Sequence, residues 1–136
     1  MNVLSNNPFE YMDNLLNKTE ADYYIVDFHA EATAEKIAMG RYLDGRVTIV
    51  YGTHTHVQTA DEQILEKGTG YITDIGMTGP KKSVIGMDIE ASLKRFTMSI
   101  PERYKLAEGE AKLNGCIFEI DDNSKKVISI ERLIME

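Results

Sequence analysis

The sequence predicts a layered α/β (α+β) fold, a sheet covered by helices, and three observations support this class. Segments with helical spacing alternate with short apolar runs over the first hundred residues. Two β-rich runs with a polar turn between them close the chain. The chain has 136 residues, 43% of them hydrophobic, which is enough for one core. We therefore expect residues 1–136 to form a single domain or part of one.

The first predicted elements are a helix and a buried strand. Residues 8–18 begin with a proline and place apolar side chains at helical spacing, which indicates a short amphipathic helix. Residues 23–28, YYIVDF, form a continuous apolar run that is typical of a strand covered on both faces. His29 follows directly after this run.

A second helix and a second strand come next. Residues 30–45 contain good helix formers, with Ala34, Ile37 and Ala38 on one apolar side, and end in an Asp-Gly pair suited to a C-terminal cap. Residues 46–52, RVTIVYG, then predict a second apolar strand, whose end leads into two further histidines.

The last elements are a third strand, a third helix and a hairpin. Residues 68–76 predict the strand, and the segment 111–120 with 125–134 predicts an antiparallel pair around the turn DDNS. The helix is expected near residues 88–99, and its apolar side would carry Ile89, Leu93, Phe96 and Ile100.

The three histidines of the chain share one location, because His29, His54 and His56 each follow a predicted strand. Strand ends are where layered α/β proteins bind ligands, and neutral imidazole is a common ligand of zinc, iron, manganese and copper. In extended backbone His54 and His56 would face the same way, with Thr55 turned aside. The alternative is that the histidines are ordinary polar residues satisfied by hydrogen bonds.

Three carboxylates near these strand ends are further candidates. Asp27 and Glu31 flank His29 and would orient its ring or approach a metal, although Glu31 is equally well explained as a solvated residue in the first turn of a helix. Asp74 ends the third strand and is a further candidate for a role in the site. The sequence offers no Walker A loop, G-x-S-x-G elbow or GxGxxG fingerprint.

Composition limits the partners. A formal charge of -7 argues against a polymeric nucleic-acid partner, which would need clustered lysine and arginine. No apolar run reaches the ~18 residues that a membrane span needs, and the first residues lack the features of a signal peptide, so we expect a cytoplasmic chain with no membrane partner. Cys116 is the only cysteine and is expected in the core of a chain kept in a reducing compartment.

The motifs DFHAEAT and GTHTHVQTAD, followed by GTGYITDIGMTGP and GMDIEASLKRF, resemble the C-terminal half of one bacterial family. These are the calcineurin-like metallophosphoesterases that act as 2',3'-cyclic-nucleotide 2'-phosphodiesterases, and the resemblance runs from about Pro8 to the end of the chain. It implies a β-sandwich of mixed sheets flanked by helices. It also implies a small-molecule cyclic nucleotide or phosphodiester as substrate.

The same resemblance implies metal ligands. His29 and His54 would bind one ion and His56 a second, and the complete site would hold two divalent or trivalent ions, iron or manganese. The family's other ligands, an Asp, a bridging Glu with its neighbour and an Asn, lie with the proton-donating His in an N-terminal half without a counterpart here. We therefore expect no catalytic residue in this chain, one bound ion or none, and no activity when it is alone.

Two alternatives remain open from the residues. The chain would serve as a non-catalytic metal-binding or assembly module derived from that enzyme, or it would pair with itself as a homo-oligomer through an exposed sheet edge.

Overall fold

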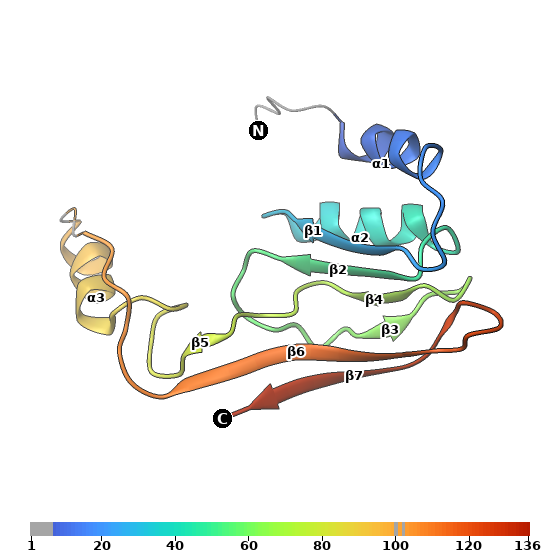
Figure 1. The fold of residues 1–136 in the computed structure, drawn as a ribbon. Coiled ribbons are helices and arrows are strands. Elements are labelled where there is room, and N and C mark those ends of the chain that lie inside the picture. The colour runs from blue at the N-terminus through green and yellow to red at the C-terminus, as the bar shows by residue number, and fades with distance from the viewer. Residues whose placement is uncertain (1–6, 100, 102) are drawn as a thin grey trace.

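The described residues form a mixed α/β fold with two sheets and three helices, which confirms the predicted class (Figure 1). The computed structural model describes residues 7–99, 101 and 103–136. The helices and strands, in chain order, are α1 (Pro8–Leu16), β1 (Ile25–His29), α2 (Thr33–Leu43), β2 (Ile49–Thr53), β3 (Gln63–Ile64), β4 (Gly70–Ile72), β5 (Gly79–Pro80), α3 (Ile89–Met98), β6 (Ala111–Ile120) and β7 (Val127–Met135).

The first sheet has the strand order β1-β2-β4-β3, and its first three strands are parallel. The short β3 runs antiparallel to β4 at the edge of this sheet. The second sheet has the order β5-β6-β7, is antiparallel throughout, and contains the predicted hairpin. Parallel strands place their carboxyl ends at the same side of a sheet, so the segments that follow β1, β2 and β4 lie near one another.

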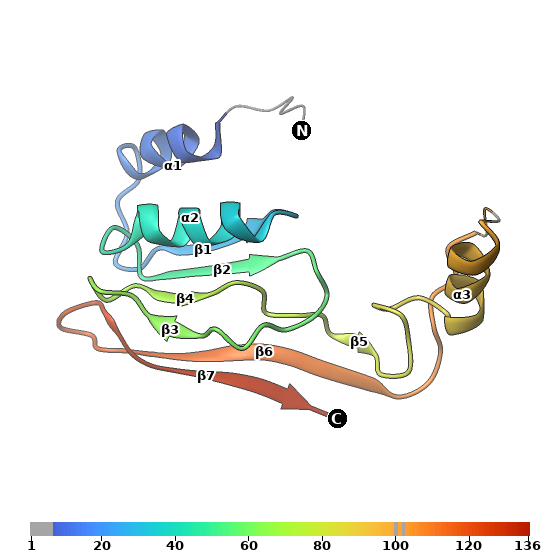
Figure 2. The ribbon, with the colours of Figure 1, turned by 180° about the vertical axis from the view of Figure 1, so that it is seen from behind.

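The first sheet is packed on both faces. Val50 and Tyr71 are register partners and belong to the core that Met39 and Leu43 of α2 complete. Helix α2 lies behind β1 in Figure 1 and in front of it in Figure 2. On the opposite face a Cβ added to Gly70 would lie 2.9 Å from Phe118 and from Val127 of the hairpin, so the two sheets are in close contact there. The core therefore lies between α2, the first sheet and the hairpin.

Strand β1 differs from the prediction of a strand covered on both faces. It is the outer strand of its sheet, and its residues alternate between exposed and half-buried. Ile25 is 61% exposed, whereas Val26 and Phe28 pack against the core. The apolar run did not predict this exposure, because β1 has a neighbouring strand on only one side among the described residues.

Helix α2 forms where expected, but its buried side is not the predicted one. The side chains of the apolar side named from the sequence, those of Ala34, Ile37 and Ala38, are exposed. The buried stripe instead has i, i+3, i+4, i+7 spacing and consists of Lys36, Met39, Gly40 and Leu43. Two features explain the difference: the missing side chain at Gly40 admits the ring of Tyr71, and the buried lysine has a carboxylate partner.

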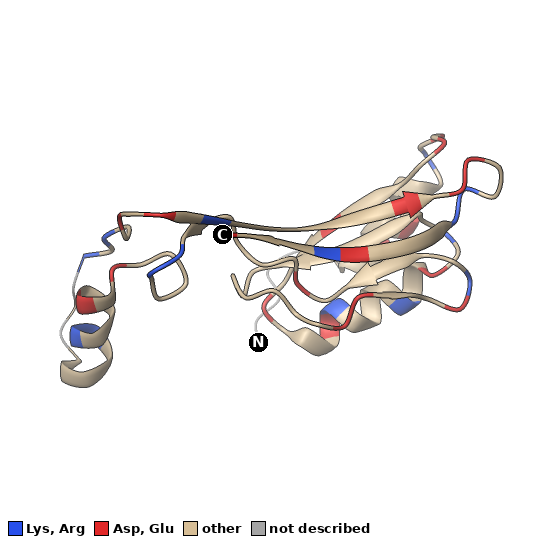
Figure 3. Cartoon of the chain, turned by 90° about the horizontal axis from the view of Figure 1, so that it is seen from below, with Lys and Arg blue, Asp and Glu red and all other residues tan. Residues whose placement is uncertain are grey.

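Helix α3 also forms as predicted, but its apolar side does not join the core. The helix lies apart from α1, α2 and the first sheet in two perpendicular views (Figures 1 and 3). Its only buried residue is Ser92, while Ile89, Leu93 and Phe96 are 45%, 55% and 77% exposed. Ile100, the fourth residue of the predicted apolar side, lies outside the described residues.

We therefore expect Phe96→Ser to change the free energy of unfolding by less than about 0.5 kcal/mol, because the ring loses little burial on unfolding. The matched substitution Phe28→Ser should cost about 2 kcal/mol, because Phe28 packs against the core. Urea unfolding followed by circular dichroism measures both. A cost above about 2 kcal/mol at Phe96 would show that α3 is covered in solution.

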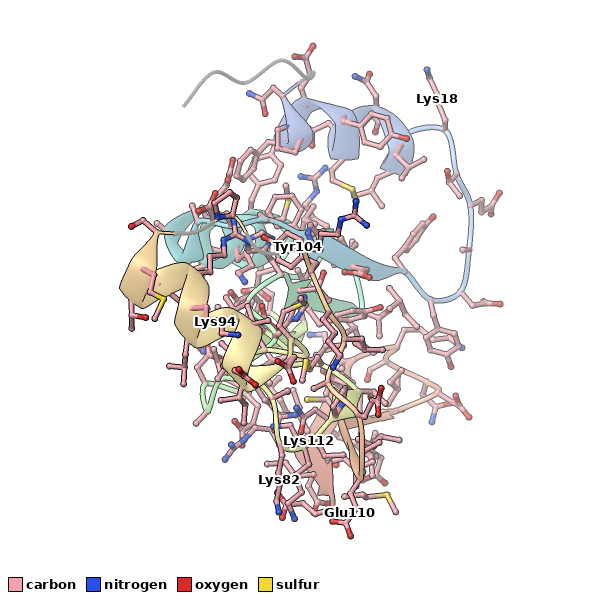
Figure 4. All side chains as sticks on the ribbon, turned by 90° about the vertical axis from the view of Figure 1, so that its left-hand side faces the viewer. Lys18, Lys82, Lys94, Tyr104, Glu110 and Lys112 are labelled. Atoms are coloured by element: carbon pink, nitrogen blue, oxygen red, sulfur yellow. The ribbon has the colours of Figure 1, made fainter. Side chains whose placement is uncertain are left out.

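Charges are interspersed on this fold. Blue and red segments both occur along the hairpin and α2 in Figure 3. Lys82, Glu110 and Lys112 gather where β5 pairs with β6, as Figure 4 shows from the side of α3. No helix within the described part of the chain has the length and apolar character needed to cross a bilayer.

Cys116 lies half-buried in β6, in partial agreement with its predicted place in the core. Burial, reinforced by the negative charge of Glu62, raises the pKa of its thiol to about 11. The thiolate is the reactive form of cysteine, so this side chain is a weak nucleophile at neutral pH.

Candidate metal centre

The first two predicted ligands meet where two parallel strands end. His29 is the last residue of β1, and its register partner Thr53 is the last residue of β2. His54 is the next residue along the chain. The pairing of parallel strands therefore brings His29 and His54 together although 25 positions separate them.

A chain of hydrogen bonds determines which ring nitrogen of His29 donates. The hydroxyl of Thr53 donates to Oδ1 of Asp27 at 3.0 Å, and this uses its single proton. The same hydroxyl oxygen lies 3.1 Å from Nδ1 of His29, so Nδ1 must be the donor in that contact. The neutral ring then carries its lone pair on Nε2, which is the arrangement of a metal-binding histidine oriented by a neighbouring group.

His54 lies against the unprotonated nitrogen of His29. Its Nδ1 is 3.2 Å from Nε2 of His29, and the ring centroids are 5.0 Å apart at an interplanar angle of 76°. Because Nε2 of His29 accepts, Nδ1 of His54 donates, and Nε2 of His54 keeps its lone pair. A cation bound at Nε2 of His29 would replace this contact between the rings.

His56 has the same donor nitrogen through a different partner. Its Nδ1 lies 2.9 Å from the carbonyl oxygen of Ile85, which can only accept, so Nδ1 donates, and in the neutral ring the lone pair is on Nε2. All three imidazoles are exposed, and each therefore presents Nε2 as a possible ligand.

The backbone of this segment is not extended, contrary to the prediction. Strand β2 ends at Thr53, and His54 and His56 have φ values of 130° and 64°. These values belong to the region that favours glycine, and such strain is often found at functional sites. We call residues 53–56 the histidine loop. Thr55 within it is half-buried while its two neighbours are exposed.

His56 has a different hydrogen-bond partner from the other two histidines. His29 and His54 are in contact, whereas His56 bonds to the segment before α3. Among residues 7–99, 101 and 103–136, no group of three or more histidine, cysteine, aspartate or glutamate side chains is arranged to hold a metal ion. The two touching imidazoles with aligned tautomers nevertheless fit part of a metal site, since their donor atoms suit first-row metal ions.

A buried ion pair lies beneath the histidine loop. Nζ of Lys36 is 2.9 Å from Oδ2 of Asp74, and both side chains are 1% exposed. Oδ2 also accepts the backbone N–H of Thr55, and Oδ1 accepts that of Gly76, each at 2.9 Å. Burial alone would raise the pKa of Asp74, but these hydrogen bonds outweigh it and hold the pKa below its usual value.

The other two candidate acids are Asp27 and Glu31. Asp27 bonds to Thr53 and adjoins Tyr51, whose pKa is raised by burial and by the negative charge of Asp27. Glu31 is exposed and precedes the helix cap Ala32, so it is not a first-turn residue of α2.

Two residues of the site are not evident from the sequence pattern. Thr53 looks like a small residue that opens space before the histidines, but its hydroxyl orients His29. Lys36 lies in a segment of ordinary helix formers, and nothing in that segment marks it as a residue of the site. Its spacing from Met39, Gly40 and Leu43 places it on the buried stripe of α2, and a lysine in such a position signals a buried partner.

Sequence comparisons give three related findings. The family model described as YmdB-like protein matches residues 1–133. The 2',3'-cyclic-nucleotide 2'-phosphodiesterase of Bacillus subtilis (strain 168) is 52% identical over 130 residues, which are 94% of this chain and 49% of that protein. A putative phosphatase/phosphodiesterase of Mycoplasma pneumoniae is 48% identical over 128 residues, covering 93% of this chain and 46% of that protein. The chain thus spans about half the length of the curated relatives it matches.

Solved structures agree with these findings. A crystal structure described as a novel phosphatase from Mycoplasma pneumoniae has a TM-score of 0.90 and 47% identity, over 95% of this chain and 46% of that one. A hypothetical protein from Thermus thermophilus has a TM-score of 0.87 and 43% identity, over 95% of this chain and 50% of that one. The two-sheet arrangement described above is therefore shared with both.

Proposed function

Because this chain belongs to the YmdB-like protein family, we propose that it supplies metal-binding histidines to the hydrolysis of small phosphodiesters, with 2',3'-cyclic nucleotides as substrates. The contact between His29 and His54 carries the proposal. Both rings stand at the carboxyl ends of parallel strands with Nδ1 protonated and Nε2 available.

In this proposal His29 and His54 hold one ion through Nε2, and His56 holds a second. Bound ions, iron or manganese by family resemblance, would neutralise phosphate oxygens and activate a water molecule. The chain's own residues have supporting roles. The hydroxyl of Thr53 bridges the carboxylate of Asp27 and the ring of His29, and the carbonyl of Ile85 orients the ring of His56. None of these side chains is proposed to transfer a proton to the leaving oxygen.

The ions need ligands beyond these imidazoles. A catalytic metal ion is commonly held by three or more protein ligands, whereas His29 and His54 supply two nitrogens to one ion and His56 supplies one to the other. We expect little cleavage of bis(4-nitrophenyl) phosphate by the 136-residue chain with Mn²⁺. Addition of the unmatched half of the Bacillus subtilis relative should restore metal-dependent cleavage, and equal activity of the chain alone would contradict the requirement for further ligands.

The metal site itself is tested by titrating the chain with Zn²⁺ in a calorimeter. Loss of an outer partner of a metal ligand commonly weakens affinity by about 10–100-fold, so His29→Ala and His54→Ala, which remove ligands, should weaken it by at least about 100-fold. Asp122→Asn at the hairpin turn is the control for an altered side chain away from the histidines and should leave the affinity unchanged. Zn²⁺ affinity that survives both histidine substitutions would overturn the proposal.

A second candidate function, a metal-binding or assembly module without catalysis, is favoured by the exposed apolar side of α3. This module would bind Zn²⁺ through the same histidines. It would show no cleavage after addition of the other half, and size-exclusion chromatography would show an oligomer that alanine at all three histidines leaves intact.

A further inference from the structure

We propose that Lys36 and Asp74 are positioning residues that hold the histidine loop in its ligand-presenting conformation. This inference rests on the proposed function, because it assigns the ion pair a role in metal binding. The geometry supports it, because the two side chains of this buried ion pair bond to the backbone on both sides of His54.

The contacts reach the two residues that flank His54. Oδ2 of Asp74 accepts the N–H of Thr55 at 2.9 Å, and Nζ of Lys36 lies 3.5 Å from the carbonyl oxygen of Thr53. The backbone on each side of His54 is therefore tied to the same pair. The positive φ of His54 has no glycine to accommodate it, so its conformation depends on such external bonds.

The pair is itself well anchored. Oδ1 of Asp74 accepts the N–H of Gly76, and the backbone N–H of Asp74 donates to the hydroxyl of Thr59 at 2.9 Å. The N–H of Thr59 in turn donates to the carbonyl oxygen of Asp74 at 3.0 Å. The aliphatic stem of Lys36 passes beside Gly52, where an added Cβ would lie 2.6 Å from its Cδ. The loop is thus tied to α2 and to the segment that follows β4.

Stability alone does not account for a charged pair in this place. Apolar residues of similar volume often stabilise a protein at least as well as a buried ion pair does. In the part of the chain that the structure describes, the other salt bridges join side chains that are at least 24% exposed. A carboxylate here supplies what an apolar side chain lacks, namely acceptors for the N–H groups of Thr55 and Gly76.

The pair acts through the loop and not as a ligand. Both side chains are buried, and the carboxylate oxygens of Asp74 already accept bonds from Lys36, Thr55 and Gly76. A substitution should therefore weaken metal binding only by displacing His54 and His56.

The test compares the full chain with the variant Lys36→Met/Asp74→Leu, which removes both charges and every bond from the pair to the loop. Calorimetric titration with Zn²⁺ should show an affinity about 10–100-fold lower than that of the unmodified chain. Arg41→Met is the matched control. It removes a cation from the same helix, but the partner of that cation, Glu66, is 74% exposed. It should bind Zn²⁺ within about twofold of the unmodified chain.

A second readout uses the chain without metal. Amide exchange measured by NMR should be at least about 10-fold faster for Thr55 in the double variant than in the unmodified chain, while Val50 in β2 keeps its protection. If this variant does not fold, Lys36→Met/Asp74→Asn takes its place. Asparagine keeps one acceptor for two N–H donors, so a smaller loss of Zn²⁺ affinity is expected from it.

The outcomes separate this inference from the proposed function. A folded double variant with unchanged Zn²⁺ affinity and unchanged Thr55 exchange would overturn the positioning role and leave the histidine site intact. If the unmodified chain shows no histidine-dependent Zn²⁺ binding, the proposed function fails, and unequal Thr55 exchange between the two proteins would still support the positioning of the loop.

Discussion

Lys36→Met is expected to lower the free energy of unfolding by about 3–5 kcal/mol, the largest loss that we predict for a single substitution in this chain. Removal of the ammonium group leaves the carboxylate of Asp74 buried without its countercharge, although its bonds to Thr55 and Gly76 remain. Urea unfolding at pH 7, with the midpoint and the slope compared between the two proteins, measures the effect.

The second substitution in the pair distinguishes a lost charge balance from lost packing. Lys36→Met/Asp74→Asn has no buried charge, so more than half of the lost stability should return. Arg41→Met should cost less than about 1 kcal/mol, because its ion pair with Glu66 is exposed. Equal losses for Lys36→Met and Arg41→Met would show that Asp74 is solvated or protonated in the folded chain.

Gly52→Ala is expected to cost about 3 kcal/mol, at the upper end of the range for overpacking. Gly52 lies inside β2, and an added Cβ would overlap the backbone carbonyl oxygen of Thr73 and approach Cδ of Lys36 to 2.6 Å. A flexible side chain would move aside, but Thr73 is bound to Asp61 through its backbone N–H and its side-chain hydroxyl. The strand end that leads to His54 must therefore shift.

The same substitution at Gly115 is the control for Gly52→Ala. Gly115 is also inside a strand, but its added Cβ would meet only Leu113, at an ordinary 4.0 Å. Gly115→Ala should be neutral or stabilise by up to about 1 kcal/mol through the less flexible unfolded chain. Thermal unfolding followed by circular dichroism compares the two, and a neutral Gly52→Ala would show that β2 and β4 separate more easily than their pairing suggests.

The contact between His29 and His54 was predictable from sequence because it depends on strand order. An apolar run before each histidine predicts a strand, and the ends of parallel neighbouring strands meet at one side of a sheet. The hairpin was predictable for a similar local reason, since its strands are consecutive and the polar turn between them is short.

The pair beneath the loop was not predictable in the same way. Lys36 and Asp74 are 38 positions apart, and neither sequence neighbourhood signals the other. The apolar spacing of Ala34, Ile37 and Ala38 favoured the opposite side of α2, because hydropathy gives no weight to Gly40 as a point of close approach. Packing between distant segments decided this face, and hydropathy along one segment does not contain that information.

The backbone of the histidine loop was unpredictable for a third reason. Positive φ values usually occur at glycine or asparagine, and those residues make them predictable from sequence. Here they occur at His54 and His56. Bonds from Thr55 to Asp74 and from His56 to Ile85 support the conformation, and all of these partners are far away in sequence.

The tethering of Thr55 has a thermodynamic consequence. A loop already held in one conformation has little freedom left to lose when a cation arrives, so ordering of the chain should oppose binding only weakly. Capture of the ion should then be limited by removal of its hydration water and by rotation of the His54 ring. A small heat-capacity change on binding is the signature that follows.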